Sequence, residues 1–230
     1  VRPGHQVVAV CVRPRRTSRS TTRLLIAARQ AAPATLGPSL VGEYDGDVLV
    51  GALVPRHRHR PTVAAFAEAL RQELGSSGGG VLVSASAPVD AIPELVTAFP
   101  GAVQTARLAQ RLAPAADIVY APDFGLYQLI ASLVDDEALE AFVNEQLGPL
   151  LDHDARTGAG LVMTLDAYLA SGLSKTRTAE MLGVRRQTLY GRLERISALL
   201  GGLDLDDRER RTALDLALVT WRLRVSGIRA

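Results

Sequence analysis

A run of four residues, Arg185-Arg186-Gln187-Thr188, carries side chains that can form hydrogen bonds with DNA. Arginine can donate two hydrogen bonds to guanine and glutamine can pair with adenine in the major groove, while threonine more naturally binds a phosphate. The run lies in a basic segment, because residues 174–200 contain six basic side chains and two acidic ones. A local excess of positive charge is typical of a surface that faces phosphates. Contact with DNA is therefore the chemistry that these residues favour.

The residues around this run have the spacing of a helix-turn-helix. Ser174 can cap a first helix, Ala179 is small where two helices must cross closely, and Gly183 can supply the turn. Apolar residues hold the inner faces of the two helices: Leu182, Val184, Leu189, Leu193 and Ile196. In this geometry the start of the second helix, which we predict to span residues 185–200, enters the major groove. The alternative is a helical hairpin whose arginines are only solvated.

Several motifs between residues 161 and 228 resemble a known DNA-binding domain. They are Leu161–Leu169, Thr178–Val184, Thr188-Leu189, Arg192-Leu193, Arg195-Ile196 and Gly201–Leu205. Together they are similar to the C-terminal domain of the PucR/CdaR family of bacterial transcriptional regulators, whose Fis-like recognition helix starts directly after a Gly-Val turn. Family members commonly have His-Arg-Asn where this chain has Arg185-Arg186-Gln187. The difference keeps the hydrogen-bonding capacity and changes the expected target sequence.

The motif and the resemblance together indicate which residues contact DNA. The candidate DNA-binding residues are Lys175, Thr176, Arg185, Arg186, Gln187, Thr188, Arg192 and Arg195. Of these, the resemblance implies Arg192 and Arg195 as phosphate contacts.

The first half of the chain alternates strand-like and helix-like segments. Asp45-Gly46 lies between two apolar runs and tolerates positive φ at both corners of a tight turn, so we predict a β-hairpin there. We expect helices over 61–74 and 91–112, the second interrupted near Pro100-Gly101. The order β-α-β-β-α-β-α-β predicts an α/β sandwich, with helices packed on an antiparallel or mixed sheet.

This first half resembles, more weakly, the degenerate GGDEF-like domain that precedes the helix-turn-helix in the same family. A working diguanylate cyclase needs a Gly-Gly-Asp/Glu-Glu-Phe hairpin and carboxylates that bind metal ions. Here the hairpin reads Gly42-Glu-Tyr-Asp-Gly-Asp47, and the strand Val7–Val12 contains no acidic residue. We therefore expect a domain kept for packing, dimerisation or relay. No enzymatic activity, cofactor or metal is expected.

From Gly125 onward the pattern is helical only, so we predict an α+β protein with three parts. Residues 1–124 form the degenerate GGDEF-like α/β sandwich, 125–158 a helical connector with a helix over 137–147, and 159–230 the all-α helix-turn-helix domain. The net charge is only +2, and the one cysteine, Cys11, lies in an apolar run where a reduced thiol is expected. No leader and no membrane span are visible, which favours the cytoplasm. The chain begins with Val1 and not with Met, which would fit the removal of the upstream sensory domain that family members often carry.

Four other segments could carry chemistry, and we assign each a structural role. The segment 56–60, Arg-His-Arg-His-Arg, lacks a third metal ligand nearby and fits a solvated loop. The segment 75–80 is Gly-rich but lacks Gly-Lys-Ser/Thr, so it fits a flexible connection. The segment 152–154, Asp-His-Asp, fits a polar linker or helix cap. Asp204, Asp206 and Asp207 precede a helix, where acidic side chains meet its positive end.

Taken together, the sequence predicts a sequence-specific, DNA-binding transcriptional regulator of bacterial type. We expect double-stranded DNA as its partner and a homodimer as its active form, because one recognition helix reads only a few base pairs. A small-molecule effector acting through the missing upstream domain is a further expected partner. The alternative is a ligand- or protein-binding interaction module whose helical end mediates oligomerisation. An oligomerisation helix would not require the exposed polar start at residues 185–188.

Overall fold

The computed structural model describes residues 4–15, 21–75, 80–112, 115–202 and 204–225. They form two compact units, with a division after Gln128. Unit 1 contains the sheet and unit 2 is helical, which confirms the predicted α+β class. Most of the segment 75–80 that we assigned as a flexible connection lies outside the described residues. Among the described helices, none has the length and apolar character that crossing a membrane requires.

Unit 1 is built on a five-stranded mixed sheet with the strand order β2-β3-β1-β4-β5. The strands are β1 (His5–Pro14), β2 (Ser39–Tyr44), β3 (Asp47–Pro55), β4 (Val81–Ala85) and β5 (Ile118–Tyr120). The neighbours pair antiparallel except β4 and β5, which pair parallel. Strands β1 to β4 with the two helices between them form a double split β-α-β arrangement. The mixed sheet with helices on it agrees with the predicted sandwich.

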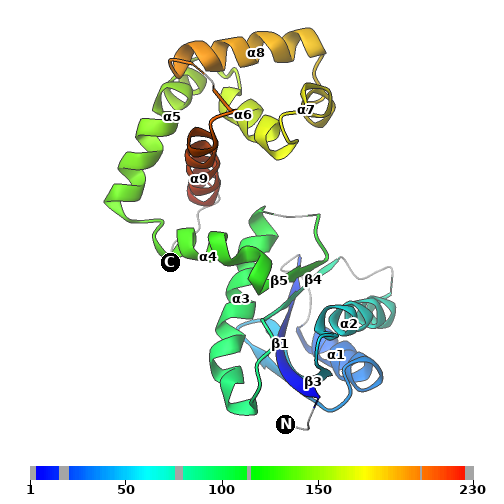
Figure 1. Ribbon diagram of the computed structural model, residues 1–230. Coiled ribbons are helices and arrows are strands. Elements are labelled where there is room, and N and C mark those ends of the chain that lie inside the picture. Colours follow the sequence, from blue (N-terminus) through cyan, green and yellow to red (C-terminus); the bar gives the residue numbers. More distant parts are fainter. Residues whose placement is uncertain (1–3, 16–20, 76–79, 113–114, 203, 226–230) are drawn as a thin grey trace. The chain divides into compact units, whose positions relative to one another are not determined.

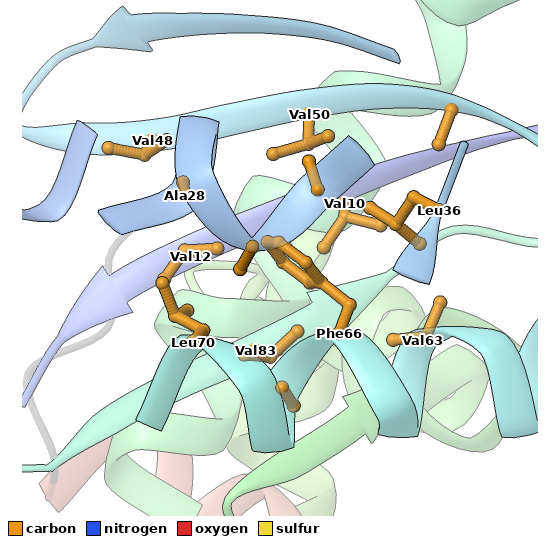
Figure 2. Packing of buried hydrophobic residues seen from close by; sticks show 14 of the residues in the cluster. Val10, Val12, Ala28, Leu36, Val48, Val50, Val63, Phe66, Leu70 and Val83 are labelled. Atoms are coloured by element: carbon orange, nitrogen blue, oxygen red, sulfur yellow. The ribbon is translucent and has the colours of Figure 1, made fainter. Parts of the chain in front are cut away.

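Helices cover both faces of this sheet (Figure 1). Helices α1 (Thr21–Thr35) and α2 (His59–Leu74) lie on one face, and α3 (Leu95–Leu112) lies on the other. Strand β1 is buried on both sides, because Val8, Val10 and Val12 point to α1 and α2 while Val7, Ala9 and Cys11 point to α3. Figure 2 shows the first of these cores, in which the fully buried ring of Phe66 lies among the valines of β1, β3 and β4.

The predicted hairpin is confirmed. Strands β2 and β3 pair from Tyr44 opposite Asp47, and the two residues between them have positive φ, 50° at Asp45 and 78° at Gly46. Positive φ at both central residues is the geometry of a type I′ turn, whose twist matches that of the two strands.

The predicted interruption of the third helix at Pro100 is wrong. A short 3₁₀ helix, η1 (Ile92–Glu94), precedes α3, and α3 then runs through Pro100. Proline removes only one hydrogen bond from the helix, and packing outweighs this loss because Ala102, Ala106 and Ala109 are buried against the sheet. The helix predicted over 61–74 likewise begins two residues earlier, at His59.

Unit 2 contains α5 (Glu137–Thr157), α6 (Leu161–Ala170), α7 (Lys175–Leu182), α8 (Arg186–Leu199) and α9 (Arg208–Val225). The short 3₁₀ helix η2 (Ala121–Phe124) leads into α4 (Gly125–Ser132), which contains the division between the units. The helix predicted over 137–147 is longer than expected and runs through Pro149 to Thr157. Leu147 and Leu150 are fully buried on either side of the proline, and their packing holds the helix together.

Candidate nucleic-acid interface

The first helix of the predicted motif, α7, begins and ends at the expected residues. The Ser174 side chain caps it by accepting a hydrogen bond from the Arg177 N–H at 3.4 Å. At the other end Gly183 adopts the left-handed conformation, with φ of 62°. The N–H of Gly183 donates to Glu180 O and the N–H of Val184 donates to Ala179 O, which is the Schellman pattern. The turn glycine therefore directs the chain from α7 into α8.

The second helix, α8, spans Arg186–Leu199, one residue shorter at each end than predicted. Arg185 is its N-cap residue and has an extended backbone, with φ of −70° and ψ of 146°. Its guanidinium carries only donors, so it cannot accept the N–H groups of the first turn. These N–H groups and the positive end of the helix dipole form a surface that favours anions.

The inner face of α8 is fixed by packing inside unit 2. Leu189 and Ile196 are 0% exposed and Leu193 is 8% exposed. They pack in one core with Ala179 of α7 and Leu165 of α6. The predicted core positions of the motif are thus confirmed, and α8 keeps a fixed orientation against α6 and α7.

The outward side of α7 and α8 carries most of the predicted DNA-binding residues. Seven of them are exposed, namely Lys175, Thr176, Arg185, Arg186, Gln187, Thr188 and Arg195, and we call this set the exposed polar cluster. In the part of the chain that the structure describes, none of its four cations forms an ion pair with a carboxylate. The charge of the cluster is therefore directed to solvent and not neutralised from within.

Arg192 differs from the other predicted residues. It is half-buried, and its Nη1 donates a hydrogen bond to Thr164 Oγ1 of α6 at 3.2 Å. Thr164 is fully buried, and its hydroxyl donates in turn to Gly160 O at 2.7 Å. The guanidinium of Arg192 thus connects α8 to α6.

Tyr190 was not among the predicted residues, although it lies one helical turn after Arg186. It is 46% exposed, and the Lys175 ammonium lies 4.7 Å from the centroid of its ring. The pair links the first residue of α7 to the second turn of α8. Tyr190 could have been found from its spacing of four residues from Arg186, which places both on one side of a helix.

Carboxylates cap the helices that support the motif. Asp154 accepts hydrogen bonds from the N–H groups of Leu161 and Val162 at 2.8 and 2.9 Å, so it caps α6. This confirms the helix-cap assignment for the segment 152–154. In the same way Asp207 accepts from Glu209 N at 3.0 Å in the first turn of α9. The described residues contain no group of three or more possible metal ligands.

One ion pair lies where α6 meets α9. Arg222 Nη1 lies 3.7 Å from Asp166 Oδ2, and the Arg222 Nε atom is buried without a hydrogen-bond partner. Burial raises the pKa of Asp166, and the charge of Arg222 offsets this rise only in part. Burial also raises the pKa of Asp215, which lies about two helical turns before Arg222 on α9, and the charge of Arg211 offsets part of this rise. These groups support the position of α6, on which α7 and α8 pack.

In unit 1, the carboxylate at the end of the hairpin turn is taken up by an arginine. Asp47 is 2% exposed, and Arg13 of β1 donates to it twice, from Nε at 2.8 Å and from Nη2 at 2.5 Å. A carboxylate held in this two-bond arrangement is already neutralised by the neighbouring strand. The Asp47 carboxylate is therefore engaged inside unit 1.

Residues 56–58 form an exposed loop, as predicted, and residues 59 and 60 begin α2, but two arginines of the segment 56–60 have partners elsewhere in unit 1. Arg56 Nη2 lies 2.8 Å from Asp90 Oδ1, and Arg60 Nη2 lies 2.6 Å from Asp123 Oδ1. Arg60 also lies over the ring of Tyr120, at 4.3 Å from its centroid. The segment connects β3 to α2, and these contacts attach both of its ends to other parts of unit 1. The two residues of each ion pair lie far apart in the sequence, so the local residue pattern could not predict these contacts.

Unit 1 also has an apolar groove on the α3 side of the sheet. Its volume is about 590 Å³, and its walls come from β1, β2, β3 and the start of α3. Leu40 and Ile92 line it and are 73% and 58% exposed. Pockets of several hundred cubic ångströms with mainly apolar walls are typical of small-molecule sites.

Three comparisons with known proteins found similarities, and the match to a family model covers the motif. Residues 161–220 match the family model of the PucR C-terminal helix-turn-helix domain. The chain is 37% identical over 89 residues to the "Uncharacterized protein in pkwA 5'region" of Thermomonospora curvata, an alignment that covers 39% of this chain and 48% of the relative. The chain thus spans about half the length of that relative. It is also similar to the solved structure of the "Regulator of Polyketide Synthase Expression from Bifidobacterium adolescentis", with 22% identity and a TM-score of 0.41 over 96% of this chain and 82% of that one.

Proposed function

We propose that this chain, whose residues 161–220 match the model of the PucR C-terminal helix-turn-helix domain, is a transcriptional regulator that binds specific double-stranded DNA. The observation that carries the proposal is the exposed polar cluster, whose cations have no internal carboxylate partner within the described residues. A rigid apolar core holds this cluster at the start of α8. A regulator fits these features better than an enzyme does.

In the proposed mechanism, the first turn of α8 enters the major groove. Arg185, Arg186 and Gln187 read the base edges, because their donors and acceptors match those of guanine and adenine. Thr188, the α8 N-terminus and the cations Lys175 and Arg195 bind phosphates and fix the register of the helix. Displacement of counterions from the phosphates makes the affinity depend on salt concentration.

The wider organisation belongs to the same proposal. Residues 1–124 are a degenerate GGDEF-like domain, 125–158 connect it to the DNA-binding domain 159–230, and two copies of the chain bind adjacent half-sites. A small-molecule effector acting through an upstream sensory domain would control this binding. The free cations support DNA as the partner, and the limited reading length of one helix supports the dimer.

A titration against DNA tests the proposed function. The wild-type chain selects duplexes from a random library, and the dissociation constant for the selected and a scrambled duplex is measured at two salt concentrations. We expect tighter binding to the selected duplex, weaker binding at high salt, and a cost of about 1–3 kcal/mol for Arg186→Ala. Arg29→Ala removes the same charge from an exposed site in unit 1 and should leave the affinity unchanged. Equal affinity for both duplexes would contradict the proposal.

A second candidate function is supported by the groove of unit 1. Its apolar walls favour an apolar small molecule, so the chain would be a ligand-binding interaction module. Titration with a dye that fluoresces in apolar surroundings tests this reading, because Leu40→Asp should abolish saturable binding. Saturable dye binding together with absent DNA binding would favour the second function over the first.

A further inference from the structure

We infer that Tyr190 is a specificity-determining residue whose ring contacts the C5 methyl group of a thymine in the major groove. The inference rests on the proposed function and adds to it an apolar contact that hydrogen-bonding residues cannot make. It depends on the position of Tyr190 on α8, on its contact with Lys175, and on the surface beside it.

The position of Tyr190 leaves much of its ring open to a partner. Leu189 and Leu193 point into the core, and a rotation of about 100° per residue places Tyr190 to the side of them. It is 46% exposed and lies one turn after Arg186. Across the whole of α8, all of which the structure describes, Tyr190 is the one large apolar side chain with this much exposure.

The contact with Lys175 orders the ring before any partner binds. The ammonium lies 4.7 Å from the ring centroid, within the range of a cation–π interaction. An aromatic side chain that is already oriented loses little conformational entropy when it joins an interface. The ring is thus held at the start of the α7–α8 motif, beside the residues proposed to read bases.

The surface next to the ring allows close approach. Gly191 follows directly, and nothing lies within 4 Å of the position that its Cβ would occupy. The exposed cations of the cluster would attract the phosphates of a bound duplex, whereas the ring of Tyr190 favours contact with an apolar group. In the major groove the apolar group on a base edge is the thymine methyl.

Replacing thymine by deoxyuridine tests the inference, because this change removes only the methyl group. A duplex selected by the wild-type chain is prepared with each thymine replaced in turn. We expect one position at which the wild-type affinity falls about fourfold, the effect of removing one buried methyl group. Tyr190→Ala should bind the thymine and deoxyuridine duplexes equally, whereas Tyr190→Phe, which keeps the ring, should still distinguish them.

The outcomes separate this inference from the proposed function. If the wild-type chain selects a duplex but no replacement weakens binding, the methyl contact is wrong while the regulator function stands. If Tyr190→Phe loses the discrimination together with Tyr190→Ala, the hydroxyl makes the contact and the inference is overturned. If no duplex is selected at all, both fail. Circular dichroism and a melting temperature close to that of the wild type show that each variant is folded.

Discussion

Arg192 has an internal partner that competes with the phosphate contact suggested by its charge. The family resemblance implies a phosphate contact, yet its Nη1 donates to the buried hydroxyl of Thr164. We expect Arg192→Ala to lower the free energy of unfolding by about 0.5–1.5 kcal/mol, the usual contribution of a hydrogen bond. Thermal or urea unfolding monitored by circular dichroism measures this loss.

The salt dependence of DNA binding then tells the two roles of Arg192 apart. Replacing a phosphate contact reduces the slope of log affinity against log salt by about 1. We expect this reduction for Arg195→Ala, which removes an exposed guanidinium from the same helix, and none for Arg192→Ala. A reduced slope for Arg192→Ala would show that the guanidinium leaves Thr164 to bind a phosphate.

Burial also changes the acidity of the Cys11 thiol, which is 0% exposed. Burial, together with the negative charge of Asp47, raises the pKa of Cys11 to about 12, although the positive charge of Arg13 acts in the opposite direction. Because the thiolate is the reactive form, native Cys11 should not react with a disulfide reagent at pH 8, and it should react fully in denaturant. Counting modified thiols by absorbance checks this. Rapid reaction in the native state would contradict it.

The same shift predicts how stability depends on pH. The folded-state pKa is above the unfolded value, so between the two the unfolded chain has lost the proton that the folded chain keeps. The free energy of unfolding should therefore fall as pH rises above about 9, by at most about 1.4 kcal/mol per pH unit from this group. Cys11→Ala removes this contribution, and the difference between the two unfolding curves isolates it.

At the scale of elements, Gly191 lowers the stability of α8, although no neighbouring atom requires a glycine at this position. Gly191 is exposed, and a Cβ there would meet open space. Glycine within a helix is less stable than alanine by about 0.5–1 kcal/mol, so Gly191→Ala should stabilise the chain by that amount. Gly101→Ala in α3, where the space is also open, is the matched control and should stabilise similarly. Destabilisation by Gly191→Ala alone would point to strain in α8.

Elements with a local cause could be predicted from the sequence, and elements decided by packing could not. Asp45-Gly46 defines a turn by its own backbone preferences, and Gly183 does the same between α7 and α8. Pro100 and Pro149 also act locally, but the buried residues around them keep both helices continuous. Local preference was therefore a good guide to turns and a poor guide to helix ends.

Contacts between distant segments were the part of the candidate site that the sequence could not supply. The pairing of Arg13 with Asp47 depends on β1 lying next to β3, and that of Arg192 with Thr164 depends on α8 lying on α6. The Lys175 and Tyr190 pair likewise depends on how α7 and α8 cross. The residue types predicted which surface would face DNA. The packing of the helices determines which side chains of that surface are exposed to solvent.

At the scale of the whole molecule, net charge is a poor indicator of the partner. The chain carries a formal charge of only +2, yet six basic and two acidic residues lie between positions 174 and 200. Phosphates respond to this local concentration, because charges more than about 10 Å away are screened at ordinary salt. The rest of the chain can therefore be nearly neutral without weakening the proposed DNA binding.

The proposed dimer makes a prediction about the geometry of its DNA. Two recognition helices in one complex must meet the same side of the duplex, so their half-sites are separated by whole helical turns, each about 10 base pairs. Inserting five base pairs between the half-sites of a selected duplex turns one of them to the opposite side, and we expect binding to weaken to that of a single half-site. Inserting ten should restore much of the affinity, since the two half-sites face the same way again. Fluorescence anisotropy titrations on the three duplexes measure this. Equal affinity for all three would show that one chain binds alone, and the specificity of the complex would then have to come from the residues of a single α8 helix.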